Sequence, residues 1–246
     1  MTQQNKSIII IGASSGIGQY AARHFAELGW RVGIAARRTE PLAELASRYG
    51  GNVIYRSLDV SADGAAEQFR NFISECGGAD IIVNAAGTGW HNPELNLKHE
   101  LATDAVNVKG FMVIATESYK YFCGRACGGH LVNISSVAYT RGMSAAPAYS
   151  ASKRYQTEYL SALRQLANAG KHKILITDIR PGFIDTPLLA GTHYLGTMSL
   201  EYAGKKIVKA ICAKKKCVYV DWRWGLISRA WRLIPRMIWE RLRVGI

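Results

Sequence analysis

Seven short apolar runs that alternate with segments of helical periodicity constrain the fold of this chain more than any other feature. The runs span residues 7–11, 31–36, 52–58, 80–84, 130–134, 173–179 and 217–220. Helix-period segments lie between them at residues 17–28, 41–49, 62–75, 100–122, 149–168 and 200–212. This alternation predicts an α/β fold, a doubly wound parallel sheet of about seven strands flanked by helices. Ligands of such sheets bind outside the carboxyl ends of the strands.

The chain has 246 residues, 48% of them hydrophobic, which suits one domain with a substantial core. Its five cysteines are scattered without Cys-x-x-Cys spacing, which argues against a disulfide framework and a zinc site, and no metal is expected. We find no secretory signal pattern and no uncharged apolar stretch of membrane-spanning length. These features favour a cytoplasmic protein.

The net charge of +13 is concentrated near the carboxyl end. From residue 205 onward there are twelve Lys or Arg residues and two acidic residues, which leaves only +3 for the first 204 residues. Nucleic-acid binding usually needs a basic surface on the fold itself, so no nucleic-acid partner is expected.

A glycine-rich turn follows the first apolar run directly. In this turn Gly12 permits a tight bend, Gly16 allows close approach of a pyrophosphate, and Gly18 allows close packing of helix on strand. The helix that begins here would direct free N–H groups at the phosphates. Glycines also occur in ordinary tight loops, but a position between strand and helix favours a dinucleotide site. The predicted contacts are Gly12, Ser14, Ser15, Gly16, Ile17 and Gly18.

The end of the second run indicates which dinucleotide would bind. An acidic residue there would bind the adenosine ribose and repel a 2′-phosphate, whereas this chain has Ala36, Arg37 and Arg38. Two guanidinium groups can bind a phosphate dianion in bidentate fashion. NADP(H) is therefore the expected cofactor. The alternative is a pair of solvated arginines at a helix start.

The next two strand ends carry small or polar residues. After the third run, Asp59 and Val60 are predicted to lie near the adenine, although Asp59 could equally cap the following helix. After the fourth run, the small residues Asn84, Ala85, Ala86 and Gly87 could lie against the adenosine. Further along, Asn107 interrupts an apolar helical pattern. A buried amide needs partners, because an unpaired one costs ~1–3 kcal/mol.

The stretch from Asn133 to Lys153 carries the candidate catalytic groups. Tyr149 opens a helical segment and Lys153 follows four positions later, so the two side chains share one helix face. The pKa of a free tyrosine is ~10, and a nearby ammonium group favours the phenolate, so Tyr149 becomes a usable proton carrier. Ser136 could hold a substrate carbonyl beside it. Taken alone, the pair could also be a half-buried helix face without chemistry.

In combination these motifs resemble the short-chain dehydrogenase/reductase family, in the family's order and spacing. The matching positions are Gly12, Gly16, Gly18, Asn84 to Gly87, Asn107, Ser136, Tyr149, Lys153, Pro181 and Gly182. The resemblance covers about residues 7–220 and implies a Rossmann-like, NADP-binding catalytic domain over residues 1–220. Ile11 and Ala85 depart from the family pattern, and we interpret them as altered hydrogen bonding around intact reacting groups.

The resemblance implies a role for each matched side chain. Tyr149 would exchange a proton with the carbinol oxygen, Lys153 would lower the pKa of Tyr149 and bind the nicotinamide ribose, and Ser136 would orient the carbonyl. Asn107 would hold a water molecule in a proton relay. The contacts at the nicotinamide end would be Pro181, Gly182, Ile184 and Thr186. The family is commonly dimeric or tetrameric, so a homo-oligomer is expected.

Residues 182–198, where this family closes over its substrate, have no obvious charge apart from Asp185. Such a segment fits a lipophilic ketone or alcohol. The carboxyl-terminal tail resembles those of short-chain reductases of long-chain lipids, and this resemblance implies a ketone such as a lipid of the 3-ketosphinganine type. We interpret His193 as a polar loop residue rather than a second catalyst. The expected function is an NADP(H)-dependent carbonyl reductase or alcohol dehydrogenase. The alternative is a non-catalytic NADP-binding sensor or membrane-associated scaffold with the same fold.

Residues 221–246 form a basic, Trp-rich tail. At helical spacing, Ile227, Trp231, Ile234, Ile238 and Leu242 share one stripe, and Arg229, Arg232, Arg236, Glu240 and Arg243 lie opposite. Pro235 should kink or split this helix. Such a helix suits an anionic membrane surface, which would make the protein peripheral on the inner face of a membrane. The alternatives are packing of the stripe on the domain itself or on a partner subunit.

Overall fold

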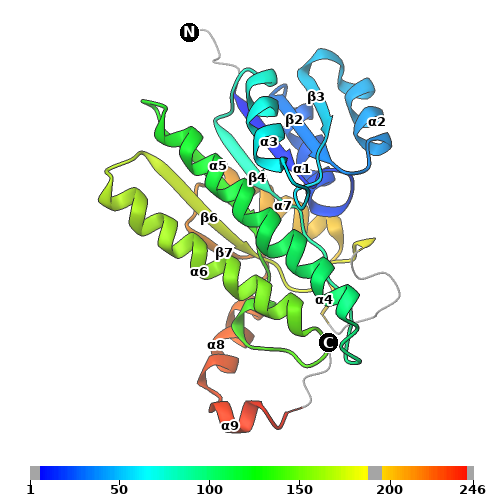
Figure 1. Cartoon of the computed structure of the whole chain (residues 1–246), viewed down its shortest axis with the longest axis vertical. Helices are drawn as coiled ribbons and strands as arrows, with labels where there is room; N and C mark the ends of the chain where they lie inside the picture. Colours follow the sequence, from blue (N-terminus) through cyan, green and yellow to red (C-terminus); the bar gives the residue numbers. More distant parts are fainter. Residues whose placement is uncertain (1–5, 188–195, 243–246) are drawn as a thin grey trace.

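The computed structural model describes residues 6–187 and 196–242, which are built around a seven-stranded parallel sheet (Figure 1). The strand order is β3-β2-β1-β4-β5-β6-β7, so the order reverses between β1 and β4, as in a doubly wound fold. The strands are β1 (Ser7–Ile11), β2 (Arg31–Ala36), β3 (Val53–Ser57), β4 (Ile81–Asn84), β5 (Gly129–Ile134), β6 (Ile174–Arg180) and β7 (Cys217–Tyr219). The predicted Rossmann-like fold is confirmed.

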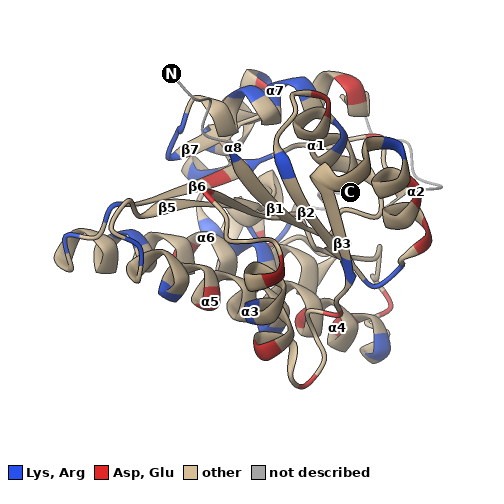
Figure 2. Ribbon diagram, turned by 90° about the horizontal axis from the view of Figure 1, so that it is seen from above, with Lys and Arg blue, Asp and Glu red and all other residues tan. Residues whose placement is uncertain are grey.

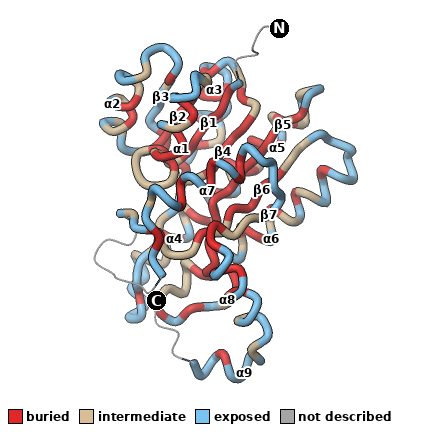
Figure 3. Tube along the Cα trace, turned by 180° about the vertical axis from the view of Figure 1, so that it is seen from behind, coloured by how far each residue is buried: buried red, intermediate tan, exposed pale blue. Residues whose placement is uncertain are grey.

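Helices cover both faces of the sheet and enclose two apolar cores. One core includes residues of α1 (Gly16–Glu27), α2 (Glu40–Tyr49), α7 (Leu200–Cys212) and α8 (Trp222–Leu233). The other includes residues of α3 (Ala65–Glu75), α5 (Phe111–Cys123) and α6 (Pro147–Ala169). The residues of β1 alternate between the two cores, and all of its Ile side chains are fully buried. Strands buried on both faces read as continuous apolar runs, which explains why they could be found in the sequence (Figure 3).

The segment predicted as one helix over residues 100–122 begins earlier and is wound in three parts. The helix α4 (Leu97–Asp104) starts at Asn96, whose side chain accepts a hydrogen bond from the backbone N–H of Lys98. A π-helical segment, η2 (Ala105–Gly110), then joins α4 to α5. Insertions of this kind are frequent at functional sites, and this one contains the buried Asn107.

Two short 3₁₀ segments complete the main body. η1 (Gly50–Asn52) leads into β3, and η3 (Val137–Thr140) follows β5. The side chain of Ser136 caps η3 by accepting a hydrogen bond from the N–H of Ala138. η3 and the loop that follows it therefore lie between two candidate catalytic residues, Ser136 and Tyr149, and Tyr149 belongs to the first turn of α6.

The tail forms α8 and, after Pro235, the short helix α9 (Arg236–Trp239), so the proline splits the predicted helix in two. Its tryptophans divide between the interior and the surface: Trp224 and Trp239 are buried, whereas Trp222 is exposed. Of the predicted stripe, Ile227 and Trp231 pack against the core. The tail of the described chain thus packs on its own domain.

The loop after η3 holds the tail in place. The guanidinium group of Arg141 donates hydrogen bonds to the carbonyl oxygens of Trp231 (3.1 Å), Arg232 (2.9 Å) and Ile234 (2.6 Å). The indole N–H of Trp239 donates to the carbonyl of Gly142 at 2.9 Å. Arg141 therefore binds carbonyl groups at the C-terminal end of α8 and just beyond it, of which that of Trp231 also accepts a hydrogen bond from the backbone N–H of Ile234.

Lys and Arg residues are concentrated in the last part of the chain, from residue 205 onward. Figure 2 shows Lys and Arg positions along α7, where Lys205, Lys206 and Lys209 lie. Within residues 6–187 and 196–242, no helix combines the length and the apolar character needed to cross a bilayer.

Candidate active site

A cavity of about 530 Å³ lies at the carboxyl ends of the first strands, beside the topological switch point. Fifteen of the predicted cofactor contacts line it: Gly12, Ser14, Ser15, Gly16, Ile17, Gly18, Ala36, Arg37, Arg38, Asp59, Val60, Ala85, Ala86, Gly87 and Thr186. Its volume is within the range of ligand pockets, ~300–1,000 Å³. Leu58, Val106 and Pro187 also line it, and the sequence interpretation had not named them.

Two glycines of the turn, Gly12 and Gly18, leave no room for a side chain. A Cβ at Gly12, whose φ is +84°, would lie 2.5 Å from the backbone nitrogen of Ala86. A Cβ at Gly18 would lie 2.3 Å from the carbonyl oxygen of Gly12. This close packing of turn on strand end and helix start forms a cradle of bare backbone at the N-terminus of α1, which fits a pyrophosphate.

Both arginines at the end of β2 line this cavity, and their side chains are exposed. The guanidinium group of Arg38 donates hydrogen bonds to the hydroxyls of Ser14 (3.3 Å) and Ser15 (3.2 Å). Arg38 is thereby held over the glycine turn. A phosphate placed there would meet a positive charge that is already oriented.

The carboxylate of Asp59 faces the same cavity and accepts hydrogen bonds from the backbone N–H (2.9 Å) and hydroxyl (2.6 Å) of Ser61. Burial works to raise the pKa of Asp59, but the bonds from Ser61 and the charge of Arg37 outweigh it and lower the pKa. Because α3 begins only at Ala65, Asp59 does not cap that helix. It closes a local turn instead.

A second cavity, of about 300 Å³, adjoins the first. Four residues line both cavities: Ile17, Ala85, Gly87 and Thr186. The second cavity contains three of the four predicted catalytic residues, Ser136, Tyr149 and Lys153, and the predicted contacts Pro181, Gly182 and Ile184. Its remaining wall is largely apolar and includes Trp90, Met143, Phe183 and Trp231. Of these four, the sequence interpretation had placed only Phe183 near the substrate, as part of residues 182–198.

Tyr149 and Lys153 lie one helical turn apart on α6, as their spacing predicts. The Nζ atom of Lys153 is 5.5 Å from the centre of the Tyr149 ring. Burial lowers the pKa of Lys153 to about 8, although the charge of Asp178 acts in the opposite direction. Burial also raises the pKa of Tyr149, and a hydrogen bond with Ser136 partly offsets this effect. In the protein alone, the phenol form of Tyr149 is therefore favoured.

The other two predicted residues, Asn84 and Asn107, line neither cavity. The side chain of Asn84 accepts a hydrogen bond from the N–H of Ala86 at 3.3 Å, which braces the loop between the cavities. The side chain of Asn107 accepts from the N–H of Thr88 at 2.9 Å and donates to the carbonyl of Thr88 at 2.7 Å. Both amides thus act on the backbone that borders the cavities.

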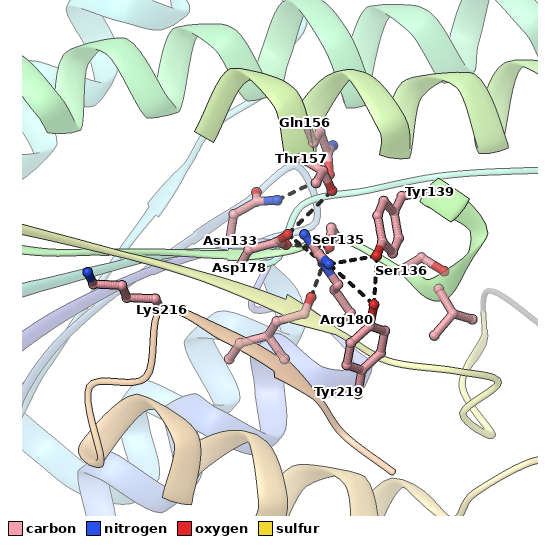
Figure 4. Close-up of polar contacts among 12 residues, drawn as sticks. Asn133, Ser135, Ser136, Tyr139, Gln156, Thr157, Asp178, Arg180, Lys216 and Tyr219 are labelled. Atoms are coloured by element: carbon pink, nitrogen blue, oxygen red, sulfur yellow. Dashed lines mark hydrogen bonds and ion pairs between the residues drawn. The ribbon is translucent and has the colours of Figure 1, made fainter. Parts of the chain in front are cut away.

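Beside Ser135, the buried carboxylate of Asp178 anchors the end of β5 (Figure 4). Asp178 accepts hydrogen bonds from Ser135 and Thr157. It also forms an ion pair with Arg180 at 2.7 Å. Arg180 also donates to the hydroxyl of Tyr139 at 2.7 Å. Because Tyr139 lies in η3, this network fixes the backbone on both sides of Ser136.

Comparisons with known proteins identify the family. A model of the family described as short chain dehydrogenase matches residues 6–193. The chain belongs to the short-chain dehydrogenase family. A Myxococcus xanthus protein described as an uncharacterized oxidoreductase is 30% identical over 248 residues, covering 96% of this chain and 95% of that protein. A Mycobacterium tuberculosis protein with the same description is 32% identical over 244 residues, covering 94% and 95%.

Solved structures share the fold of this short-chain dehydrogenase. A short-chain dehydrogenase from Sphingobium yanoikuyae in complex with NADPH superposes with a TM-score of 0.79 at 19% identity, covering 98% of each chain. A 3-ketoacyl-(acyl-carrier-protein) reductase from Brucella melitensis complexed with NADH gives 0.79 at 22% identity, covering 89% of this chain and 98% of that one. As a member of the family, the chain is an oxidoreductase of the NAD(P)H-dependent type.

Proposed function

We propose that this short-chain dehydrogenase is an NADP(H)-dependent reductase of ketones or aldehydes, or the dehydrogenase of the corresponding secondary alcohols. The observation that carries the proposal is the continuity of the two cavities. One is lined by the glycine turn and the arginines, the other by Ser136, Tyr149 and Lys153, and they meet at shared residues. A dinucleotide in the first cavity would present its nicotinamide where these side chains converge, and when bound it supplies or accepts the hydride.

The side chains of the second cavity would handle the proton. Ser136 would donate a hydrogen bond to the substrate carbonyl and hold its oxygen beside Tyr149. Tyr149 would give its phenolic proton to this oxygen during reduction and take it back during oxidation. The ammonium group of Lys153 would stabilise the phenolate that remains after the transfer. Pro181, Gly182, Ile184 and Thr186 would border the nicotinamide, and Asn107 would brace the loop on the opposite side.

The preference for NADP(H) over NAD(H) rests on the end of β2. No carboxylate follows Ala36 there, and two guanidinium groups border the cavity instead. A 2′-phosphate can accept charge-assisted hydrogen bonds from Arg37 and Arg38, whereas a plain ribose gains much less from them.

The apolar lining of the second cavity supports a lipophilic substrate. Apart from Ser136, Tyr149 and Lys153, its charged or hydrogen-bonding side chains are few, and four large apolar or aromatic side chains cover its walls. A long-chain ketone, such as a lipid of the 3-ketosphinganine type, suits this lining better than a sugar or a phosphate ester. His193, which was interpreted as a polar loop residue, lies outside the described residues.

The outer face of the tail supports contact with an anionic membrane surface. Leu233 and Met237 are 83% and 72% exposed, and Ile238 is also exposed. Exposed arginines, including Arg229 and Arg236, lie on the same two helices. Apolar side chains beside cations are typical of interfacial helices. Such contact would place the substrate cavity, which Trp231 borders, close to a lipid source.

Co-sedimentation with vesicles containing phosphatidylserine tests this contact. The variant to compare replaces Leu233, Met237 and Ile238 with Ser, since removal of the whole tail would also remove a wall of the substrate cavity. Lower binding of the triple variant, and no binding to neutral vesicles by either protein, is the expected result. Equal binding by both proteins would remove the membrane proposal.

We further propose a homo-oligomer, a dimer or tetramer formed through two long helices of the main body, α5 and α6. Met112 on α5 and Leu166 on α6 are 39% and 55% exposed, which supports a contact there. Light scattering coupled to gel filtration would measure the mass directly.

The enzymatic proposal is tested by NADPH oxidation with long-chain ketones, steroids and short aldehydes. Tyr149→Phe should reduce turnover of every accepted carbonyl by about 10²–10⁴-fold while NADPH affinity is kept. NADPH binding without turnover of any carbonyl or alcohol would favour a non-catalytic sensor or scaffold. Turnover by Tyr149→Phe at the normal rate would remove the proposed role of this residue.

A further inference from the structure

Gln156 lies on α6, three positions after Lys153, and is completely buried. It lines neither cavity. Its side-chain oxygen accepts hydrogen bonds from Nζ of Lys153 at 3.3 Å and from the side chain of Asn133 at 3.1 Å. Its side-chain nitrogen donates to the main-chain oxygen of Asn107 at 2.8 Å. One amide thus connects the candidate site residues Lys153 and Asn107 with Asn133 of β5.

The Gln156 amide belongs to a chain of hydrogen bonds that ends at two backbone groups, the N–H of Ala86 and the carbonyl of Asn107. These two groups fix which atom of the amide is the oxygen. At one end, the N–H of Ala86 can only donate, so Asn84 receives it with its oxygen and must donate with its nitrogen to Asn133, at 2.8 Å. Asn133 therefore accepts with its oxygen and donates with its nitrogen to Gln156.

At the other end, the carbonyl of Asn107 can only accept, so the nitrogen of Gln156 must face it. The remaining lone pair of the Gln156 oxygen then faces Lys153. A flipped amide would set donor against donor at both Lys153 and Asn133 and leave the carbonyl of Asn107 facing an acceptor.

We propose that Gln156 is a positioning residue that holds the ammonium group of Lys153 in place beside Tyr149 and connects it to the backbone of Asn107. This role rests on the proposed function of Lys153. The second contact of the ammonium group is the carbonyl of Ile134 at 3.2 Å. Two neutral oxygens therefore fix the direction of Nζ, and neither neutralises its charge.

The charged and titratable groups near Lys153 are few. Tyr149 lies beside it on α6, and Asp178 of β6 acts on it through space while paired with Arg180. The groups that face it from β5 and η2, Asn133 and Asn107, are neutral. A new charge at position 156 should therefore dominate the titration of Lys153.

The test is the pKa of Lys153 in the free protein, measured by NMR on selectively ¹³C-labelled lysine, with the signal assigned by its loss in Lys153→Arg. Gln156→Glu has nearly the same shape but carries a negative charge, and it should raise this pKa by about one unit or more. Gln156→Met removes the acceptor and should lower it. The control is Gln165→Glu, an exposed position on the same helix, which should leave the pKa unchanged.

A pKa of Lys153 that is the same in Gln156→Glu, Gln156→Met and the unchanged protein would overturn the proposal. If both variants fail to fold, hydrogen exchange of the side-chain N–H groups of Gln156 in the unchanged protein tests the proposal instead. Slow hydrogen exchange supports the buried contacts, and exchange as fast as that of a solvated amide refutes them.

The titration needs neither cofactor nor substrate, so it separates this inference from the proposed function. Where turnover is found, the pH profile of kcat/KM in Gln156→Glu should move in the same direction as the pKa of Lys153. A purely structural role would lower activity without moving the profile. The pKa of Lys153 could shift in Gln156→Glu although the protein reduces no carbonyl. This result would support the contact between Gln156 and Lys153 and refute the proposed function.

Discussion

Lys153 Nζ lies 5.5 Å from the centre of the Tyr149 ring, and both side chains line the same cavity. The ammonium group is nearly inaccessible to solvent, and its burial lowers the pKa of Lys153 to about 8. Its loss of charge therefore falls near the working pH of most enzymes.

We expect kcat/KM for carbonyl reduction to decline as the pH rises through about 8. Above this pH, Lys153 is neutral and no longer stabilises the phenolate that Tyr149 forms when it gives up its proton. The measurement is a pH profile of kcat/KM, which reports the pKa values of the free enzyme. In Lys153→Arg the residual activity should persist to higher pH, because the guanidinium group stays charged. If kcat/KM declines at the same pH in Lys153→Arg and in the unchanged protein, titration of Lys153 is not the cause of the decline.

Arg38 should govern the choice of cofactor, because Ser14 and Ser15 hold its guanidinium group over the glycine turn. We expect Arg38→Ala to raise the Kd for NADPH by roughly 10- to 100-fold, since a charge-assisted hydrogen bond contributes about 1.5–3 kcal/mol. The Kd for NADH should change little. Fluorescence titration of both cofactors checks this, with Arg48→Ala on the surface of α2 as the control. Equal losses for both cofactors would contradict a contact with the 2′-phosphate.

His130 should make stability depend on pH. It is buried, and burial, with a smaller effect from Lys214, lowers its pKa from 6.5 to about 4. Between these values the unfolded chain binds more protons than the folded one, so stability should decrease as the pH falls through this window. From pH 7 to pH 5 the loss should be about 2 kcal/mol.

Urea unfolding at the two pH values measures this loss. His130→Gln keeps a polar group beside Thr177 but cannot titrate, so its loss over the same interval should be smaller. His172→Gln, at an exposed position, should behave like the unchanged protein. An equal pH dependence in all three proteins would assign the effect to other groups.

Arg141 should couple the tail to the substrate cavity. Its three hydrogen bonds to the end of α8 hold Trp231 against the cavity, and Met143 of the same loop lines it. We expect Arg141→Ala to lower the free energy of unfolding by ~1–3 kcal/mol and to raise KM for the carbonyl substrate. The affinity for NADPH should stay the same. Arg229→Ala, an exposed position on α8, is the control, and an equal effect there would contradict the specific role of Arg141.

Trp231 should set the size of the substrates that are accepted. Replacing it with Ala would enlarge the apolar cavity that it lines, so kcat/KM for bulky ketones should rise relative to that for short aldehydes. Competition assays with pairs of ketones measure this ratio. Leu233→Ala, on the exposed side of α8, should leave it unchanged. An unaltered ratio in Trp231→Ala would place the substrate elsewhere.

The fold and most of the lining of the first cavity could be predicted from the sequence, because both follow from local patterns. Buried parallel strands are continuous apolar runs, and the turn from Gly12 to Gly18 directly follows the first of them. The spacing of Tyr149 and Lys153 likewise fixes their shared helix face.

Features that depend on distant contacts could not be predicted in this way. The π-helical winding around Asn107 interrupts a pattern that reads as continuous helix. Gln156 gains its role from partners on other elements. The tail pattern was compatible with a membrane, a partner or its own domain, and contacts such as that of Trp239 with Gly142, 97 positions earlier, belong to the third alternative.

The position of Trp231 has a consequence for how such a protein can diverge. The strands, the glycine turn and the side chains of Ser136, Tyr149 and Lys153 all precede residue 220, yet Trp231, which lines the same cavity as these three, comes after it. Substitutions in the last two helices can therefore change which molecules are accepted without disturbing the sheet or the coenzyme cradle. Two relatives could therefore catalyse the same reaction and differ in substrate specificity through roughly their last twenty-five residues.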